Sequence, residues 1–153
     1  MSGERRVLDE ETRRKLAGVI SFSPDAEVKI DPYEDSDIAA EDRPLFWVHP
    51  YTRAEKTRIT SLQKQFLTSE GRVKIDDKAM EILFGLVRSK VVRWAQVFDG
   101  TTGEEIAFEA DELGQVRLDL WDRAVPETVR SRLLTALSVI SGLREPEKLS
   151  LRS

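Results

Sequence analysis

The sequence predicts an α+β fold that is mostly helical, in which three to four main helices pack with one or two short β-hairpins. Apolar residues recur at helical spacing in the segments 52–66, 76–94 and 126–141. They alternate with polar residues in the segment 19–30 and flank a glycine-rich turn in the segment 97–108. Such patterns are typical of short strands joined by a turn.

Composition excludes several classes of protein. The chain has 153 residues, enough for one hydrophobic core, and its 40% hydrophobic and 34% charged residues are ordinary for a globular domain. It has no cysteine, which excludes disulfides, thiolate metal sites and thiol catalysis. No apolar run approaches the roughly 18 to 20 residues of a membrane span, and the N-terminus has no apolar signal region. We therefore expect a cytoplasmic protein.

We expect three parts along the chain: a charged, mobile leader (1–18), a hairpin with an acidic linker (19–44), and a mainly helical core domain (45–153). In the leader, Asp9 is a suitable N-cap for a short amphipathic helix that Gly18 would end. The turn sequence Ser23-Pro24-Asp25 predicts a hairpin with strands at 19–22 and 27–30. An extended arm is the alternative, because two strands alone are marginally stable.

Charge is unevenly distributed. The net charge is −4, which argues against general nucleic-acid binding. The segment 25–43 holds eight acidic residues against two basic ones, whereas the segment 52–65 holds four basic residues against Glu55 alone. These two segments could attract each other, or each could face a different partner. We interpret residues 31–44 as a loop or mobile linker.

The core domain begins with the apolar strand 45–48, which His49-Pro50 ends. Thr52 and Glu55 have the spacing of a capping box for a helix over 52–66. A loop at 68–71 and a brief strand at 73–75 lead to the central helix, which starts at Asp76 or Asp77 and carries apolar residues as far as Trp94.

The central helix has a wide apolar stripe, which indicates burial on more than one side. Gly85 in its interior costs about 1 kcal/mol relative to alanine, a cost that a close approach by another backbone could justify. In the hairpin that follows, Val97 and Phe98 lie opposite Ile106 and Phe108 across the turn 100–103.

The segment 113–121 is ambiguous between helix and strand. Pro126 begins the last helix and Gly142 ends it, since proline favours the first turn and glycine the C-terminal stop. The polar tail that follows has Leu149 and Leu151 as candidate anchors.

The candidate chemical sites have simpler explanations. His49 is the only histidine and has no catalytic partner in the sequence. An EF-hand loop that begins at Asp31 would need glycine at position 36 and glutamate at position 42, where Ser36 and Asp42 stand. Turn chemistry explains the acidic, glycine-rich segment 99–105. The three tryptophans are expected in the core or at its rim. We therefore predict no catalytic, metal-binding or cofactor-binding residue, and no enzyme.

Several short strings occur in a familiar order. These are Leu45-Phe46-Trp47-Val48, Thr52-Arg53-Ala54-Glu55, Val91-Val92-Arg93-Trp94, Val97-Phe98-Asp99, Gly103-Glu104-Glu105-Ile106-Ala107-Phe108, and a leucine-rich helix ending Ser138-Val139-Ile140-Ser141-Gly142-Leu143. This order, over about residues 45–151, resembles the small tail assembly chaperones and related tail-morphogenesis proteins of tailed bacteriophages. The segment 19–43 is not part of the pattern.

The resemblance implies a non-enzymatic protein of the host-cell cytoplasm that binds the tape measure protein, with tail tube subunits and self-association as further candidates. It also implies a protein that leaves the finished particle. A structural virion subunit, such as a connector or tube-end protein, is one alternative. A regulatory nucleic-acid-binding module that uses the helix 52–66 is another. We expect partners to bind the helices 52–66 and 126–141, through Arg53, Lys56, Arg58, Arg130 and Leu134.

Overall fold

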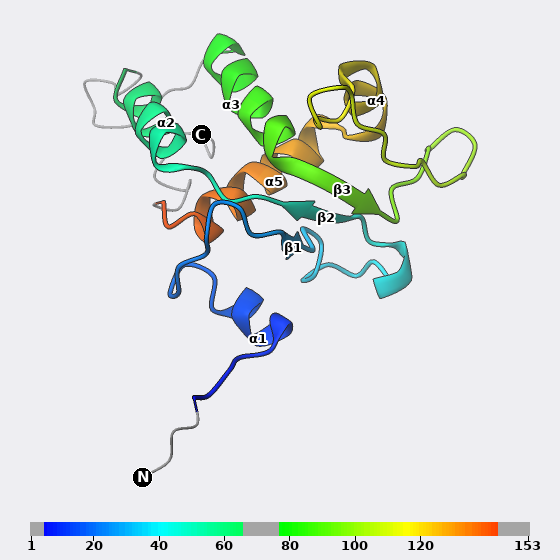
Figure 1. Cartoon of the computed structure of the whole chain (residues 1–153). Helices are drawn as coiled ribbons and strands as arrows, with labels where there is room; N and C mark the ends of the chain where they lie inside the picture. The colour runs from blue at the N-terminus through cyan, green and yellow to red at the C-terminus, as the bar shows by residue number, and fades with distance from the viewer. Residues whose placement is uncertain (1–4, 66–76, 144–153) are drawn as a thin grey trace.

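The computed structural model describes residues 5–65 and 77–143. Predictions for Phe66, the loop 68–71, the brief strand 73–75, the cap Asp76 and the tail 144–153 lie outside the described residues. The predicted α+β class is confirmed (Figure 1). The elements follow the order α1 (Glu10–Lys15), β1 (Val28–Ile30), η1 (a 3₁₀ turn, Ala40–Asp42), β2 (Leu45–Val48), α2 (Arg53–Gln65), α3 (Asp77–Lys90), β3 (Val91–Ala95), α4 (Leu118–Ala124) and α5 (Glu127–Ile140).

The strands form an antiparallel sheet of order β1-β2-β3. Phe46 in the central strand pairs with Ile30 on one side and Trp94 on the other, and the register shifts between Trp47 and Val48. Because side chains alternate across a strand, one face of the sheet is buried and the other is not. The buried face carries Val28, Ile30, Phe46, Val48, Val91 and Trp94.

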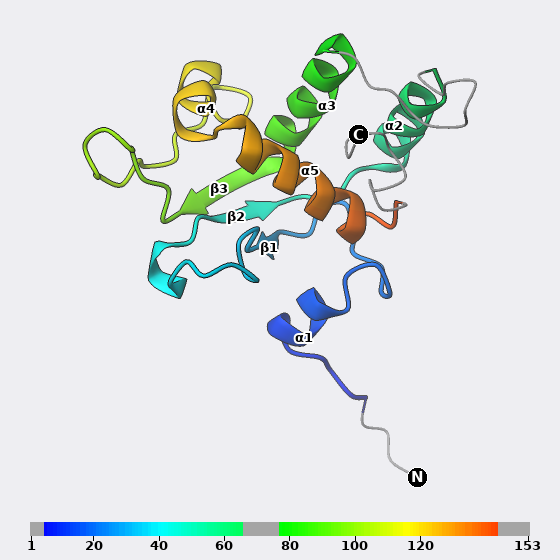
Figure 2. The same cartoon turned by 180° about the vertical axis from the view of Figure 1, so that it is seen from behind.

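Helix α5 runs across the buried face of the sheet, as the two opposite views show (Figures 1 and 2). Leu133 and Leu137 of this helix are fully buried and belong to the same core cluster as the inner residues of the sheet. After the helix, Gly142 has a positive φ of 77°, and Leu143 N donates to Ser138 O at 2.9 Å. This αL ending is a Schellman motif, which confirms the stop predicted at Gly142.

The hairpin predicted for residues 19–30 is wrong. The turn is present, since Ala26 N donates to Ser23 O at 3.0 Å. However, β1 pairs with β2 rather than with residues 19–22, where Val19 is 79% exposed. Pairing of β1 with β2 is favoured because it places Val28 and Ile30 on the core. Pairing with residues 19–22 would leave a two-stranded ribbon uncovered. A strand from the predicted linker region therefore shares the sheet of the predicted core domain.

The predicted central helix is correct at its start and too long at its end. It begins at Asp77 and stops at Lys90, where the chain continues directly into β3. Val91 and Val92 are β-branched and favour a strand, and Trp94 faces Phe46 across the sheet. Strand pairing thus outweighs the helical spacing of the apolar residues 91 and 94.

The remaining local predictions have mixed outcomes. The capping box is confirmed: Glu55 N donates to Thr52 Oγ1 at 3.2 Å and Thr52 N to Glu55 Oε1 at 2.8 Å. The second hairpin is present in a short form: Ile106 N donates to Val97 O at 2.7 Å, Asp99 N donates to Glu104 O at 2.8 Å, and Phe98 forms an isolated bridge with Glu105. In the ambiguous segment 113–121, Val116 forms an isolated bridge with Ala110, and the first turn of α4 follows from Leu118.

Candidate functional site

The predicted partner-binding residues do not gather into one site. On α2, Arg53 and Arg58 are exposed and Lys56 is half-buried. On α5, Leu134 is only 3% exposed, because it belongs to the core. A partner could contact Leu134 only if the core opened, so this residue lacks the exposure that a docking role needs.

Arg130 is held by its own chain. Its Nε donates to Val125 O at 2.8 Å, and its Nη2 donates to Asp122 Oδ1 at 3.0 Å. The guanidinium also lies over the ring of Trp121, 5.2 Å from the centroid. These contacts fix Arg130 on the wall of an open groove.

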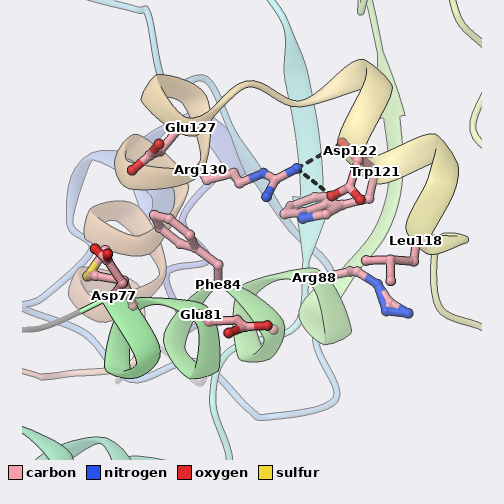
Figure 3. Close-up of a pocket in the computed structure, with 11 residues that line it drawn as sticks. Asp77, Glu81, Phe84, Arg88, Leu118, Trp121, Asp122, Glu127 and Arg130 are labelled. Atoms are coloured by element: carbon pink, nitrogen blue, oxygen red, sulfur yellow. Dashed lines mark hydrogen bonds and ion pairs between the residues drawn. The ribbon is translucent and has the colours of Figure 1, made fainter.

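This groove, which we call the α3–α5 groove, has a volume of about 560 Å³ (Figure 3). Helix α3 forms one wall, and α4 with the start of α5 forms the other. The lining residues are Asp77, Met80, Glu81, Phe84, Gly85, Arg88, Leu118, Trp121, Asp122, Glu127 and Arg130.

The α3 wall is a continuous stripe of one helix. Its residues lie at positions 77, 80, 81, 84, 85 and 88, the three- and four-residue spacing of a single helical face. Phe84 points into the groove from this stripe (Figure 3) and is 9% exposed. The opposite wall presents Trp121, which is 2% exposed, and Leu118, which is 59% exposed. The groove therefore has an apolar floor between two helical walls.

Gly85 is open to the groove, which corrects the suggestion that another backbone approaches it. A Cβ built on Gly85 would meet nothing within 4 Å. The helix backbone is consequently bare at the middle of the groove, and no other described part of the fold occupies the space beside Gly85.

The groove lining is acidic. It holds four carboxylates and two guanidiniums, a formal charge of −2. Arg130 is engaged as described, and Arg88 Nε donates to Val116 O at 3.2 Å. Asp77, Glu81 and Glu127 form no ion pair with any residue that the structure describes. Negative charge therefore dominates at the end of the groove where α3 and α5 begin.

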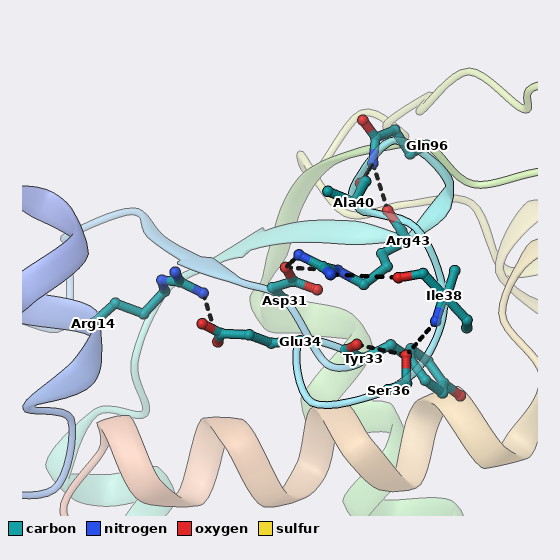
Figure 4. A network of polar contacts seen from close by, with 9 residues as sticks. All are labelled: Arg14, Asp31, Tyr33, Glu34, Ser36, Ile38, Ala40, Arg43 and Gln96. Atoms are coloured by element: carbon teal, nitrogen blue, oxygen red, sulfur yellow. Dashed lines mark hydrogen bonds and ion pairs between the residues drawn. The ribbon is translucent and has the colours of Figure 1, made fainter.

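The acidic segment 31–43 is a loop that arginines hold in place (Figure 4). Arg43 donates twice to Asp31 Oδ2, at 2.9 and 3.1 Å, and Arg14 of α1 pairs with Glu34 at 2.9 Å. Arg132 of α5 lies over the ring of Tyr33, 4.3 Å from the centroid. Within the described part of the chain, this segment forms no ion pair with α2.

The other sequence candidates have structural roles. His49 Nδ1 lies 2.8 Å from Ala26 O, a contact between two connecting segments. Asp99 Oδ1 accepts hydrogen bonds from Thr101 N and Thr102 N at 2.7 and 3.2 Å, the geometry of an Asx turn. Among the residues that the structure describes, no group of three or more His, Cys, Asp or Glu residues is arranged to hold a metal ion.

Trp94 links the sheet to the segment after it. Its Nε1 donates to Ile106 O at 2.8 Å, and its ring makes edge contacts with Phe46 and Phe108, with centroids 6.2 and 5.1 Å apart. The sheet and the segment 97–108 are therefore joined through Trp94.

Of the residues that line the groove, the sequence predicted only Arg130 as a partner-binding residue. The wide apolar stripe of α3 and the glycine in its interior were the sequence signals that pointed to the groove. The opposite wall includes Leu118 and Trp121, which lie in the segment 113–121 that the sequence left ambiguous. In the described ranges, no helix is both long and apolar enough to span a bilayer. No protein-family model matches the chain, and comparison with curated proteins and with solved structures finds no match either.

Proposed function

We propose that this chain is a non-enzymatic tail assembly chaperone of a tailed bacteriophage or prophage, which binds the tape measure protein in the host cytoplasm during tail morphogenesis. The observation that carries the proposal is the α3–α5 groove, an open groove with apolar and acidic lining residues that the side chains of the described residues leave unfilled. Recognition of a helix in such a groove is a common way to hold an elongated helical partner.

The arrangement of the resembling strings supports the same proposal. The strings that contain Phe46, Trp94 and Phe108 are far apart in the sequence, yet their rings meet in one cluster. The string 138–143 forms the end of α5 and its Schellman stop. The strings therefore belong to one packed scaffold, which is compatible with the proposal.

The proposal is tested by co-expression with the tape measure protein encoded in the same gene cluster. We expect a soluble complex that survives affinity purification. Gly85→Trp should abolish the complex, because an indole at position 85 would occupy the groove. Lys78→Trp is the matched control, since Lys78 is exposed on α3 and does not line the groove. A tape measure protein that stays insoluble and unbound beside the wild-type chain would contradict the proposal.

Two rival functions predict different results. A connector or tube-end protein would be found by mass spectrometry of purified virions, whereas a chaperone would be missing from them. A nucleic-acid-binding module would bind DNA with an affinity that falls steeply with salt. The exposed Arg53 and Arg58 of α2 would then be the residues whose substitution weakens that binding.

A further inference from the structure

We propose that the occupant of the α3–α5 groove is a basic amphipathic helix, whose lysines or arginines lie over the end formed by Asp77, Glu81 and Glu127. This inference rests on the proposed function, because it specifies which kind of client segment the chaperone binds. It is argued from the shape of the groove, its floor and its charge.

The shape favours a helix. On α3, the groove stripe extends from Asp77 to Arg88. With a rise of 1.5 Å per residue, these eleven steps span about 16 Å, or roughly three helical turns. A partner helix of the same length would present apolar residues at positions i, i+3 or i+4, and i+7 along the trough.

The floor favours close packing of that helix. Leu118, which is 59% exposed, supplies the apolar edge that a partner can contact, whereas Phe84 and Trp121, at 9% and 2% exposed, close the bottom of the groove. Between them, Gly85 has no side chain and no neighbour within 4 Å of a Cβ built there. A backbone can approach a glycine more closely than any other residue, so Gly85 marks the position where the partner helix comes nearest.

The charge selects a basic helix over an acidic one. Asp77 and Glu127 lie in the first turns of their own helices, whose N-termini offset part of their charge. Glu81 lies one turn further along α3 and has no such compensation. The two arginines of the lining already donate to backbone carbonyls of this chain. A ligand with lysine or arginine therefore complements the groove, whereas one with glutamate or aspartate meets like charge.

The experiment uses the full chain and two designed peptides. Both are capped helical peptides of about 14 residues, or four turns, with leucine on one face and either lysine or glutamate on the other. The readout is the backbone amide resonance of Gly85 in an NMR titration, assigned by its loss in Gly85→Ala. We expect the lysine peptide to shift this resonance in a saturable manner and the glutamate peptide to leave it in place. Equal shifts with both peptides, or none with either, would overturn the inference.

A charge-reversed variant tests the role of the carboxylates. Glu81→Lys combined with Glu127→Lys should weaken binding of the lysine peptide about tenfold or more. The matched control is Glu41→Lys combined with Glu112→Lys, which changes the net charge equally at exposed positions outside the groove. An equal loss of binding in the control would refute a local role of the groove. Circular dichroism of each variant verifies that it is folded.

The two proposals fail in different experiments. If the tape measure protein does not bind but the lysine peptide does, the phage function is wrong and the groove specificity stands. If the tape measure protein binds while Gly85 does not respond to the lysine peptide, the function stands and the client uses another surface.

Discussion

Two glycines of this chain have opposite effects on stability. Gly85 lies inside α3 with ordinary helical backbone, whereas Gly142 has a φ of 77° at the end of α5. At neither position would an added Cβ come within 4 Å of a described residue beyond the neighbouring backbone. The difference between them is therefore purely conformational, since glycine is unfavourable in a helix interior and favourable in the left-handed region.

We expect Gly85→Ala to raise the free energy of unfolding by about 1 kcal/mol, because alanine restricts the unfolded chain and favours the helix. Gly142→Ala should lower it by about 1 to 2 kcal/mol, because an L-residue is strained at that φ. Urea unfolding monitored by circular dichroism measures both values. A loss of stability in Gly85→Ala would mean that the bare backbone is required by the fold itself.

Tyr51 carries a buried hydroxyl without a partner. The residue is 1% exposed, and its Oη has no hydrogen bond to any group that the structure describes. Burial, together with the nearby charge of Glu55, raises the pKa of the Tyr51 hydroxyl far above its ordinary value. The hydroxyl therefore stays neutral and unsatisfied.

Tyr51→Phe removes this polar atom and keeps the ring. We expect the free energy of unfolding to rise by about 1 kcal/mol, since an unpaired buried hydroxyl carries a desolvation cost. Thermal unfolding by calorimetry tests this, with Tyr33→Phe as the control because Tyr33 is only half-buried. A clear decrease in stability would reveal a hydrogen bond at Tyr51 Oη.

At the scale of elements, one carboxylate joins α2 to α3. Glu55 completes the capping box of α2 and also pairs with Lys90 at the end of α3. Burial alone would raise the pKa of Glu55, but hydrogen bonds from Lys90 and Thr52 outweigh it and lower the pKa below its ordinary value. A lowered pKa means that the ionised form stabilises the folded protein.

The lowered pKa of Glu55 determines how the stability of Glu55→Gln should depend on pH. The stabilisation is fully present above the unfolded pKa of about 4.3 and is lost as the pH falls through the lower pKa of the folded state. We expect the variant to be about 1 to 2 kcal/mol less stable at pH 7, with a difference that shrinks below about pH 4. Glu112→Gln, at an exposed position, should match the wild type throughout. A difference that is independent of pH would assign the effect to packing.

Local signals in the sequence predicted the parts of the fold that depend on local interactions. The capping box at Thr52, the cap at Asp9 and the stop at Gly142 are all confirmed, because each uses neighbouring backbone groups. The strand partners were not predictable in this way. Val28 pairs with Val48, and Trp94 with Phe46, so the partners are distant in sequence.

The groove was not predictable for the same reason. Its two walls come from α3 and from α4 with α5, and neither wall is concave alone. The sequence offered helix α3 with a wide apolar stripe, but it could not indicate which part of that stripe the fold would leave uncovered. Leu134 was predicted to contact a partner, but its side chain lies on the core side of α5.

At the scale of the whole molecule, α1 is peripheral. It has no buried residue; Arg14 forms an ion pair with Glu34, and Glu10 and Arg13 line a small cavity beside β1. In the segment that follows, Ala17 and Phe22 pack against the core, and Gly18 lies beside Val139 of α5. The core therefore depends little on α1.

We expect deletion of residues 1–15 to lower the free energy of unfolding by less than about 1 kcal/mol, since surface ion pairs and terminal helices contribute little. Urea unfolding of the truncated and full chains measures the difference. A loss of several kcal/mol would show that the leader is part of the cooperative unit.

The pairing of β2 with β3 also determines when the protein can fold during synthesis. Trp47 meets Arg93, which is made 46 residues later, and α5 covers the buried face only after that. Contacts between such distant residues slow folding, because a long loop must close before they form. A ribosome-bound chain that ends at residue 90 has β1 and β2 without their third strand. We expect such chains to be digested by protease and chains released at full length to resist it, so that most of the native core forms after the last helix has emerged.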